Sequence, residues 1–414
     1  MTFFPSDSHD KSAIHVAIAS MAAVAVALGI GRFAFTPLLP AMLSAGWFDI
    51  DGSGWLASAN YAGYCLGALT CGCVRWAAPK VVRFGLIATC VLTMLMAVFT
   101  QFPIWMLLRF LSGACSAWTF IFAAQWGARW LSAKGASSLV GIIYTGSGIG
   151  ILLTGLAGAL ISEWGTPVQG WMAFSLMAAM TTVMILARYP NDDVSDEALR
   201  RDRSPQPKFR SEFHDGIDAS HRRSRAVWLV LTYAVPGFGY IISATFLPVI
   251  AQAALPDSNL GDFFWPLIGL AIVPGALIAG RLPRRWDNRL MLAVCYLIQS
   301  AAILISTMSP TVLGLAVGCI LLGLPFTAIS YFAMCEAEYL YGHHCAGLMG
   351  YATASYGVGQ IVGPLIATRS VAITGSFDAA LYLAASALGG GTIVLLWRWF
   401  ADSERVCRSS PGTS

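Results

Sequence analysis

Apolar stretches long enough to cross a lipid bilayer recur along almost the whole chain. A helix needs about 20 predominantly apolar residues to cross ~30 Å of hydrocarbon. Such stretches predict twelve spans, at residues 13–44, 54–74, 81–101, 103–126, 138–160, 170–188, 226–252, 263–281, 289–308, 311–335, 345–367 and 377–399. Lipid cannot bond exposed backbone N–H and C=O groups, so each span has to be a helix. The composition agrees, because only 11% of the residues are charged, against about 25% in a typical soluble domain. The sequence therefore predicts an all-α integral membrane protein.

The positive charges predict how the spans are oriented. If the N-terminus is cytoplasmic and the spans alternate, every Lys and Arg outside the spans except Arg369 falls in a cytoplasmic segment. By the positive-inside rule this bias predicts that both termini are cytoplasmic. The apolar stretch that follows Lys11 is too long for the core of a cleavable signal peptide.

A polar stretch at residues 189–225 divides the spans into six and six. It is rich in Asp, Arg, Ser and Pro, which is typical of a flexible linker. The predicted domains are an N-terminal six-helix bundle at 1–188, this cytoplasmic linker, and a C-terminal six-helix bundle at 226–414 that ends in a short cytoplasmic tail.

The two halves carry an internal repeat. The segment GIGRFAFTPLLP (29–40) aligns with GFGYIISATFLP (237–248) at an offset of 208 residues, and the glycine pair at 148 and 150 aligns with the pair at 357 and 359 at an offset of 209. Six spans separate the paired helices, so the halves point the same way across the membrane. The sequence thus predicts two parallel bundles around a central cavity, with alternating access by rocking of one bundle on the other.

Several of these segments resemble motifs of the major facilitator superfamily. LLRFLSGACSA (107–117) resembles that family's RxxxG motif, with Arg109 and Gly113 in the motif positions. GCVRWAAPKVVRFG and GRLPRRWDNRL resemble its cytoplasmic loop motif, although the first lacks the acidic residue. The aligned segments at 29–40 and 237–248 most resemble the bacterial YbfB/YjiJ-like branch. The resemblance implies a monomeric transporter of the bacterial inner membrane without a defined substrate, tilts the direction toward export, and gives Arg109 a role in proton coupling.

Arg32 is the most informative single residue, because it lies past the middle of the first predicted span. A charge at that depth costs at least ~2.5–3.5 kcal/mol on insertion scales unless it faces a partner or a watery cavity. One interpretation is an anchor for an anionic or polar substrate group, since the guanidinium fork matches carboxylate and phosphate. The other is a structural charge satisfied by carbonyls that Pro37 and Pro40 free. The aligned residue of the second half, Tyr240, is the expected polar counterpart.

Other polar residues of the spans have two interpretations each. Asn60, Tyr64, Tyr144 and Gln360 are candidates for lining the cavity or for hydrogen bonds between helices. Glu336, near the cytoplasmic end of the tenth span, is a candidate proton acceptor or a charge paired with arginines of the cytoplasmic loops. Arg109 is a proton-coupling residue or a partner within its own bundle.

Other functional classes lack their motifs. A Walker A sequence is absent, as are paired catalytic acids, a CxxC pair or a cluster of metal ligands within the spans. We therefore expect no enzyme activity, cofactor or metal, and the net charge of +4 does not suggest nucleic acid. The predicted function is secondary active transport of a small polar or anionic solute, with proton-coupled export as the expected mode. Proton-driven multidrug or sugar efflux is the alternative; a membrane sensor or a membrane enzyme is less favoured.

Overall fold

The computed structural model describes residues 8–186, 219–256, 258–282, 286–342 and 345–409, and within these ranges the chain is helical without a strand. The N-terminal half holds α1 (Ser8–Val24), the π-helix η1 (Ala25–Ile30), α2 (Phe35–Ser44), α3 (Ile50–Thr70), α4 (Ala78–Val98), α5 (Phe102–Ala133), α6 (Val140–Trp164) and α7 (Pro167–Leu186). The C-terminal half holds α9 (Ala219–Ala254), α10 (Phe264–Ala279), α11 (Asn288–Met308), α12 (Val312–Gly323), α13 (Phe326–Tyr341), α14 (Ala346–Thr374) and α15 (Asp378–Ser409).

Ten segments of the described chain are long and apolar enough to cross a membrane. The remaining two predicted spans, the second and the eleventh, coincide with α3 and α14, which are 21 and 29 residues long. These two helices are rich in Gly, Ser, Thr and Tyr, and they pack against each other where the halves meet. Their polarity follows from that position, because an interface between helices tolerates small and polar side chains better than lipid does. The count of twelve spans stays a prediction.

The predicted linker is too long at its C-terminal end. Residues 219–225 already belong to α9, and residues 187–218 lie outside the described residues. The last helix is longer than expected as well, since α15 continues to Ser409 instead of ending near residue 399.

Two predicted spans, each found as one apolar segment, consist of more than one helix. The first changes from α1 through η1 and a turn at 31–34 into α2. The tenth divides into α12 and α13 at Leu324 and Pro325. Proline supplies no backbone N–H, so it commonly marks such breaks.

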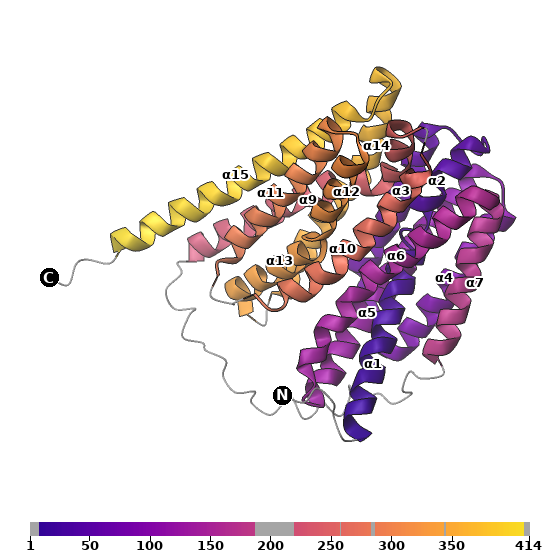
Figure 1. Cartoon of the computed structure of the whole chain (residues 1–414). Helices are drawn as coiled ribbons and strands as arrows, with labels where there is room; N and C mark the ends of the chain where they lie inside the picture. The colour runs from indigo at the N-terminus through magenta and orange to yellow at the C-terminus, as the bar shows by residue number, and fades with distance from the viewer. Residues whose placement is uncertain (1–7, 187–218, 257, 283–285, 343–344, 410–414) are drawn as a thin grey trace.

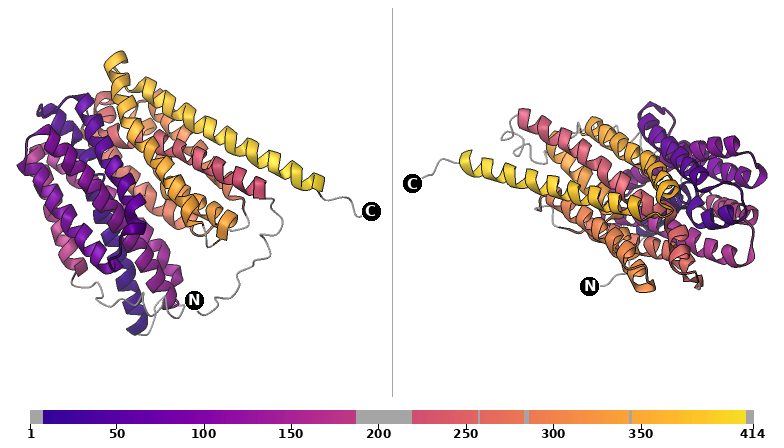
Figure 2. Two further views of the ribbon diagram at one scale, coloured as in Figure 1. Left: turned by 180° about the vertical axis from the view of Figure 1, so that it is seen from behind. Right: turned by 90° about the horizontal axis from the view of Figure 1, so that it is seen from above.

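The halves meet in pairs of helices that the repeat makes equivalent. Figures 1 and 2 show the two groups of helices close together around α2, α3 and α14, and splayed apart toward the end where α1 begins and α15 ends. The contacts between halves are made chiefly by α3 with α14, by α6 with α10 and by α2 with α9. A twofold axis between the halves takes the second span onto the eighth and the eleventh onto the fifth. The contact between the second and eleventh spans therefore requires an equivalent contact between the eighth and fifth, which is the pairing that a parallel repeat predicts.

Individual contacts follow the same symmetry. A Cβ added to Gly148 would meet Val273, and one added to Gly357 would meet Cys65, the aligned residue of the other half. Two hydrogen bonds between the halves join residues that are 208 positions apart, Arg32 with Tyr240 and Thr36 with Ala244. Residues related by a twofold axis can touch each other only at the axis, so Arg32 lies at the centre of the molecule.

Candidate functional site

The first helix is broken at Arg32, and the N-terminal half holds the break in place. Backbone bonds from Gly31 to Val26 and from Phe33 to Leu28 widen the helix to the π form at 3.0 and 3.1 Å. The carbonyl oxygen of Gly31 accepts from Asn60 Nδ2 at 3.2 Å and from Ser112 Oγ at 2.7 Å. Polar side chains of α3 and α5 therefore satisfy the backbone of the broken turn.

Arg109 and Asn60 belong to this support. Arg109 Nη2 donates to the carbonyl oxygen of Arg32 at 3.1 Å, and Asn60 Nδ2 also donates to the carbonyl oxygen of Arg109 at 2.9 Å. Both side chains are almost fully buried. This geometry favours the second interpretation of each residue, a hydrogen-bond partner between helices. Neither the Arg109 guanidinium nor the Asn60 amide nitrogen is exposed.

The guanidinium of Arg32 points away from these carbonyls. It is 5% exposed, and its Nη2 donates to the Tyr240 hydroxyl at 3.4 Å. The Cζ atom of Arg32 lies 4.1 Å from the ring centre of Tyr64, and 5.0 and 5.4 Å from the ring centres of Phe33 and Tyr61. Cation–π contact offsets part of the cost of burying the charge. Among the described residues no carboxylate pairs with Arg32, and its Nε atom has no partner.

The C-terminal half completes the site with Tyr240 and Gln360. Gln360 Nε2 donates to the Tyr240 hydroxyl at 2.5 Å, while Gln360 Oε1 has no partner within the described ranges. The Tyr240 ring lies against Phe326 and Tyr356, with ring centres 5.2 and 6.1 Å apart. Of the six residues that the sequence suggests for substrate binding, the structure thus brings Arg32, Tyr64, Tyr240 and Gln360 together, with Asn60 behind them.

Tyr144 and Glu336 lie away from this group. Tyr144 is on α6, is 40% exposed, and its hydroxyl makes no hydrogen bond among the described residues. Glu336 is buried at the end of α13 and accepts from Arg225 Nη2 at 2.6 Å. The arginine comes from α9 rather than from a loop, but the ion pair is of the kind that the second interpretation of Glu336 expects.

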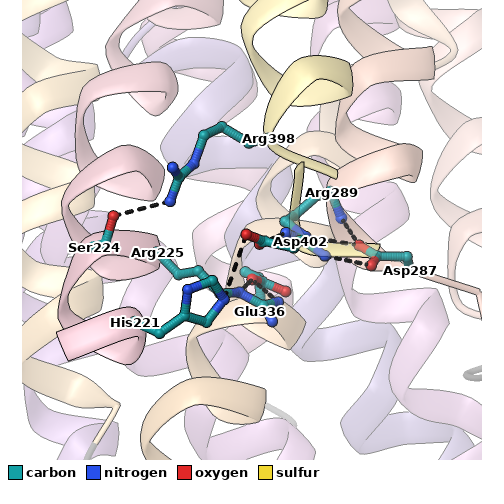
Figure 3. A network of polar contacts seen from close by, with 8 residues as sticks. All are labelled: His221, Ser224, Arg225, Asp287, Arg289, Glu336, Arg398 and Asp402. Atoms are coloured by element: carbon teal, nitrogen blue, oxygen red, sulfur yellow. Dashed lines mark hydrogen bonds and ion pairs between the residues drawn. The ribbon is translucent and has the colours of Figure 1, made fainter. Parts of the chain in front are cut away.

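This ion pair is part of a wider network at one end of the C-terminal half, shown in Figure 3. Asp402 of α15 contacts His221 at 3.4 Å and pairs with Arg289 of α11. Arg289 also pairs with Asp287 at 2.9 Å, and Arg398 donates to Ser224 at 2.9 Å. The network joins the ends of α9, α11, α13 and α15. Among the described residues no group of three or more His, Cys, Asp or Glu could hold a metal ion.

Sequence reasoning missed Tyr61, Tyr356 and Phe326 around the centre. Tyr61 is three residues from Tyr64, and Tyr356 is four residues from Gln360, so helical spacing placed each beside a residue that was already a candidate. The tyrosines could have been found by that signal. Phe326 could not, because it reaches the site only through the break between α12 and α13.

Comparison with known proteins points to one family. The profile of the family described as "Uncharacterised MFS-type transporter YbfB" matches residues 24–396. The crystal structure of nucleoside transporter NupG is similar, with a TM-score of 0.67 and 13% identity over 94% of this chain and 98% of that chain. An aspartate-to-alanine mutant of NupG gives 0.69 and 14% over 94% and 99%. At this identity the likeness concerns the fold. No curated protein matches the chain.

Proposed function

Because this chain belongs to the YbfB-type family of major facilitator superfamily transporters, we propose that it carries a small anionic solute by alternating access, with Arg32 as the anchor. One observation carries the proposal: Arg32 is buried at the centre, between the halves, without a carboxylate partner among the described residues. A buried charge without a partner is strongly destabilising, and a counter-ion offsets that cost. A solute that supplies a carboxylate or phosphate would provide it through charge-assisted hydrogen bonds.

The alternative substrates fit this centre less well. A cationic drug would meet the charge of Arg32, and no described acid lies beside the guanidinium to offset it. A sugar needs several side-chain donors and acceptors, yet the Asn60 amide nitrogen is already bonded to two backbone carbonyls. An anion therefore remains the preferred class, with proton-driven multidrug or sugar efflux as the alternative.

We further propose that protons drive the transport and that Glu336 binds the coupled proton. Its carboxylate is buried and paired with Arg225, so protonation would break a contact between α13 and α9. A proton released or taken up when the solute binds, measured with a pH dye in weakly buffered solution, would support coupling if it disappears in Glu336→Gln. The family resemblance and the charge distribution support export, an inner-membrane location, cytoplasmic termini and a monomer.

The anchor is tested by thermal unfolding of the purified protein with carboxylates, phosphates, sugars, amino acids and cationic amphiphiles. A ligand that binds the folded state raises its Tm. We expect anions to stabilise the wild type and not Arg32→Gln. Arg129→Gln is the control, because Arg129 is an exposed arginine bonded to Gln125 at 2.9 Å, outside this centre, and its loss should leave anion stabilisation unchanged. Stabilisation by cations alone, or an equal anion response in Arg32→Gln, would contradict the proposal.

A further inference from the structure

Two hydrogen-bond donors from opposite halves converge on a single oxygen atom at the centre. The Tyr240 hydroxyl oxygen lies 3.4 Å from Arg32 Nη2 and 2.5 Å from Gln360 Nε2. Arg32 comes from the broken first helix, and Gln360 comes from α14. An oxygen between a guanidinium and an amide donor stands where a bound carboxylate oxygen would be expected.

The groups around this oxygen have unused bonding capacity. Arg32 Nε and Gln360 Oε1 are buried and have no hydrogen-bond partner in the part of the chain that the structure describes. Buried polar atoms are nearly always bonded, and each one that is not costs free energy. The bond from Arg32 to Tyr240 is also longer than the usual N–H···O range. A neutral hydroxyl therefore occupies the centre but does not complete the hydrogen bonding of Arg32 and Gln360.

We propose that the Tyr240 hydroxyl occupies, in the empty carrier, the subsite that an anionic oxygen of the solute takes in the loaded carrier. The inference rests on the proposed function, since it presumes that Arg32 binds the solute. The hydroxyl gives the buried guanidinium an acceptor when no solute is present. It brings no negative charge, so an anion displaces it.

The surroundings narrow the solute to an aromatic monocarboxylate. Arg32 supplies the only guanidinium that points to this oxygen among the described residues, because Arg109 is bonded to a backbone carbonyl. One guanidinium matches one anionic group. The rings of Tyr64, Phe326 and Tyr356 lie against Arg32 and Tyr240, and aromatic rings favour a planar, apolar remainder of the solute beside its anionic group.

The test compares benzoate with its neutral analogue benzamide by calorimetric titration and by thermal unfolding. The proteins are the wild type, Tyr240→Phe, Arg32→Gln and Tyr296→Phe. Tyr296 is a matched control because its buried hydroxyl donates to the Thr232 carbonyl, away from the centre. We expect benzoate to bind the wild type and to bind Tyr240→Phe about fivefold more tightly, the ratio that one lost competing hydrogen bond implies. Tyr296→Phe should match the wild type, and benzamide should bind none of them well.

The outcomes separate this inference from the proposed function. If Arg32→Gln still binds benzoate, Arg32 is not the anchor and both fail. If Arg32→Gln loses binding but Tyr240→Phe binds no more tightly than the wild type, only the role of Tyr240 fails. If benzoate binds neither the wild type nor Tyr240→Phe, the aromatic monocarboxylate is the wrong class. Should Tyr240→Phe not fold, Gln360→Met removes the second donor instead; it should weaken benzoate binding, and unchanged binding would overturn the inference.

Discussion

Two buried amide side chains, Asn60 and Gln299, differ in what they bond. Asn60 Nδ2 donates to two backbone carbonyls, one of which belongs to the broken turn at Gly31. Gln299 of α11 is equally buried, but neither atom of its amide group has a partner among the described residues. Removing a bonded amide leaves its acceptors unsatisfied, whereas replacing an unbonded amide by an apolar group relieves a desolvation cost.

Asn60→Leu should therefore lower the free energy of unfolding by about 1–3 kcal/mol, and Gln299→Met should leave it unchanged or raise it. Thermal and denaturant unfolding of the purified protein measure both. The comparison is between amides of similar burial, so general sensitivity to a change in the core cannot explain a difference. Equal losses in the two variants would show that Asn60 does not hold the break.

Asp287 makes stability depend on pH at the start of α11. Its carboxylate accepts from the backbone N–H of Arg289 at 2.9 Å and from the guanidinium at 2.9 and 3.1 Å. Burial raises the pKa of the Asp287 carboxyl, but the hydrogen bonds and charge of Arg289 outweigh it and hold the pKa below its usual value. A lowered folded pKa stabilises the fold above the unfolded pKa, about 3.9, and this contribution is lost as pH falls through the folded pKa.

Asp287→Asn keeps the capping oxygen and removes the charge. Its Tm should lie below that of the wild type at pH 7, by a stability difference of a few tenths to about 1 kcal/mol. The gap should close as pH falls below about 4. Unfolding curves of both proteins across this range provide the measurement, with Asp378→Asn as a second acidic control at a helix start. A gap that is constant with pH would mean that the charge of Asp287 is not responsible.

At the scale of helices, glycines set how closely the broken first helix approaches α6. A Cβ added to Gly29 would lie 2.5 Å from the Cα atom of Gly150, closer than real Cβ atoms come to backbone. Gly237 and Gly359 repeat the arrangement between α9 and α14. The repeated glycine pairs that mark the sequence are therefore packing positions.

Gly29→Ala should destabilise the protein by about 1–3 kcal/mol, because η1 and α6 would have to separate. Gly390→Ala serves as the control. Nothing lies within 4 Å of a Cβ at Gly390, so there alanine should gain up to about 1 kcal/mol from helix propensity. Unfolding of the two variants decides the matter, and a neutral Gly29→Ala would show that the contact at Gly150 yields easily.

The sequence predicted the repeat and the positions of the helices well, because hydropathy and glycine spacing are properties of each segment alone. It placed the first span at 13–44, where the structure has the apolar segment Ser12–Ser44, but it did not predict the π-helix and turn at 25–34 inside that span. The break depends on Asn60, Arg109 and Ser112, which reach the turn only after α3 and α5 have packed beside it. At the aligned position, Asn60 is replaced by Ile268, and α9 stays helical although it contains Pro236 and Pro248.

The same limit applies to the site. The offset of 208 residues paired Arg32 with Tyr240 correctly, because a contact on a twofold axis follows from the repeat itself. The support role of Asn60 and the partner of Glu336 were open, because both depend on which side chains arrive from other helices. Tyr144 has the residue type of a binding site, but only the packing of α6 decides what it faces.

At the scale of the whole molecule, the two halves are joined along one part of their interface. Three side chains of α3 make these contacts. Asp51 accepts from Thr368 at 3.3 Å, and Ser58 donates to the Ile361 carbonyl at 2.7 Å. The Tyr61 hydroxyl lies 2.9 Å from Thr245 Oγ1 of α9. Toward the other end of these helices lie Gly72, in the short 3-10 helix Cys71–Cys73 that follows α3, and Gly350 on α14. Among the described residues nothing lies within 4 Å of a Cβ placed at either glycine, so neither position makes a close contact with the other half.

Alternating access requires that the joined part opens when the separated part closes. A disulfide between Asp51→Cys and Thr368→Cys, in a protein whose native cysteines are replaced, should hold the joined part shut. A third cysteine, Gly350→Cys, should then react faster with a maleimide reagent, because the disulfide prevents the conformation in which the separated part is closed. The increase in rate should equal the factor by which the population of that conformation falls, and reduction of the disulfide should reverse it. Ser132→Cys with Ser137→Cys is the control pair, because these hydroxyls lie 3.3 Å apart within one half and their disulfide should leave the labelling rate unchanged. If locking the joined part slows labelling at Gly350→Cys or leaves it unaltered, the two ends of the interface do not open in alternation.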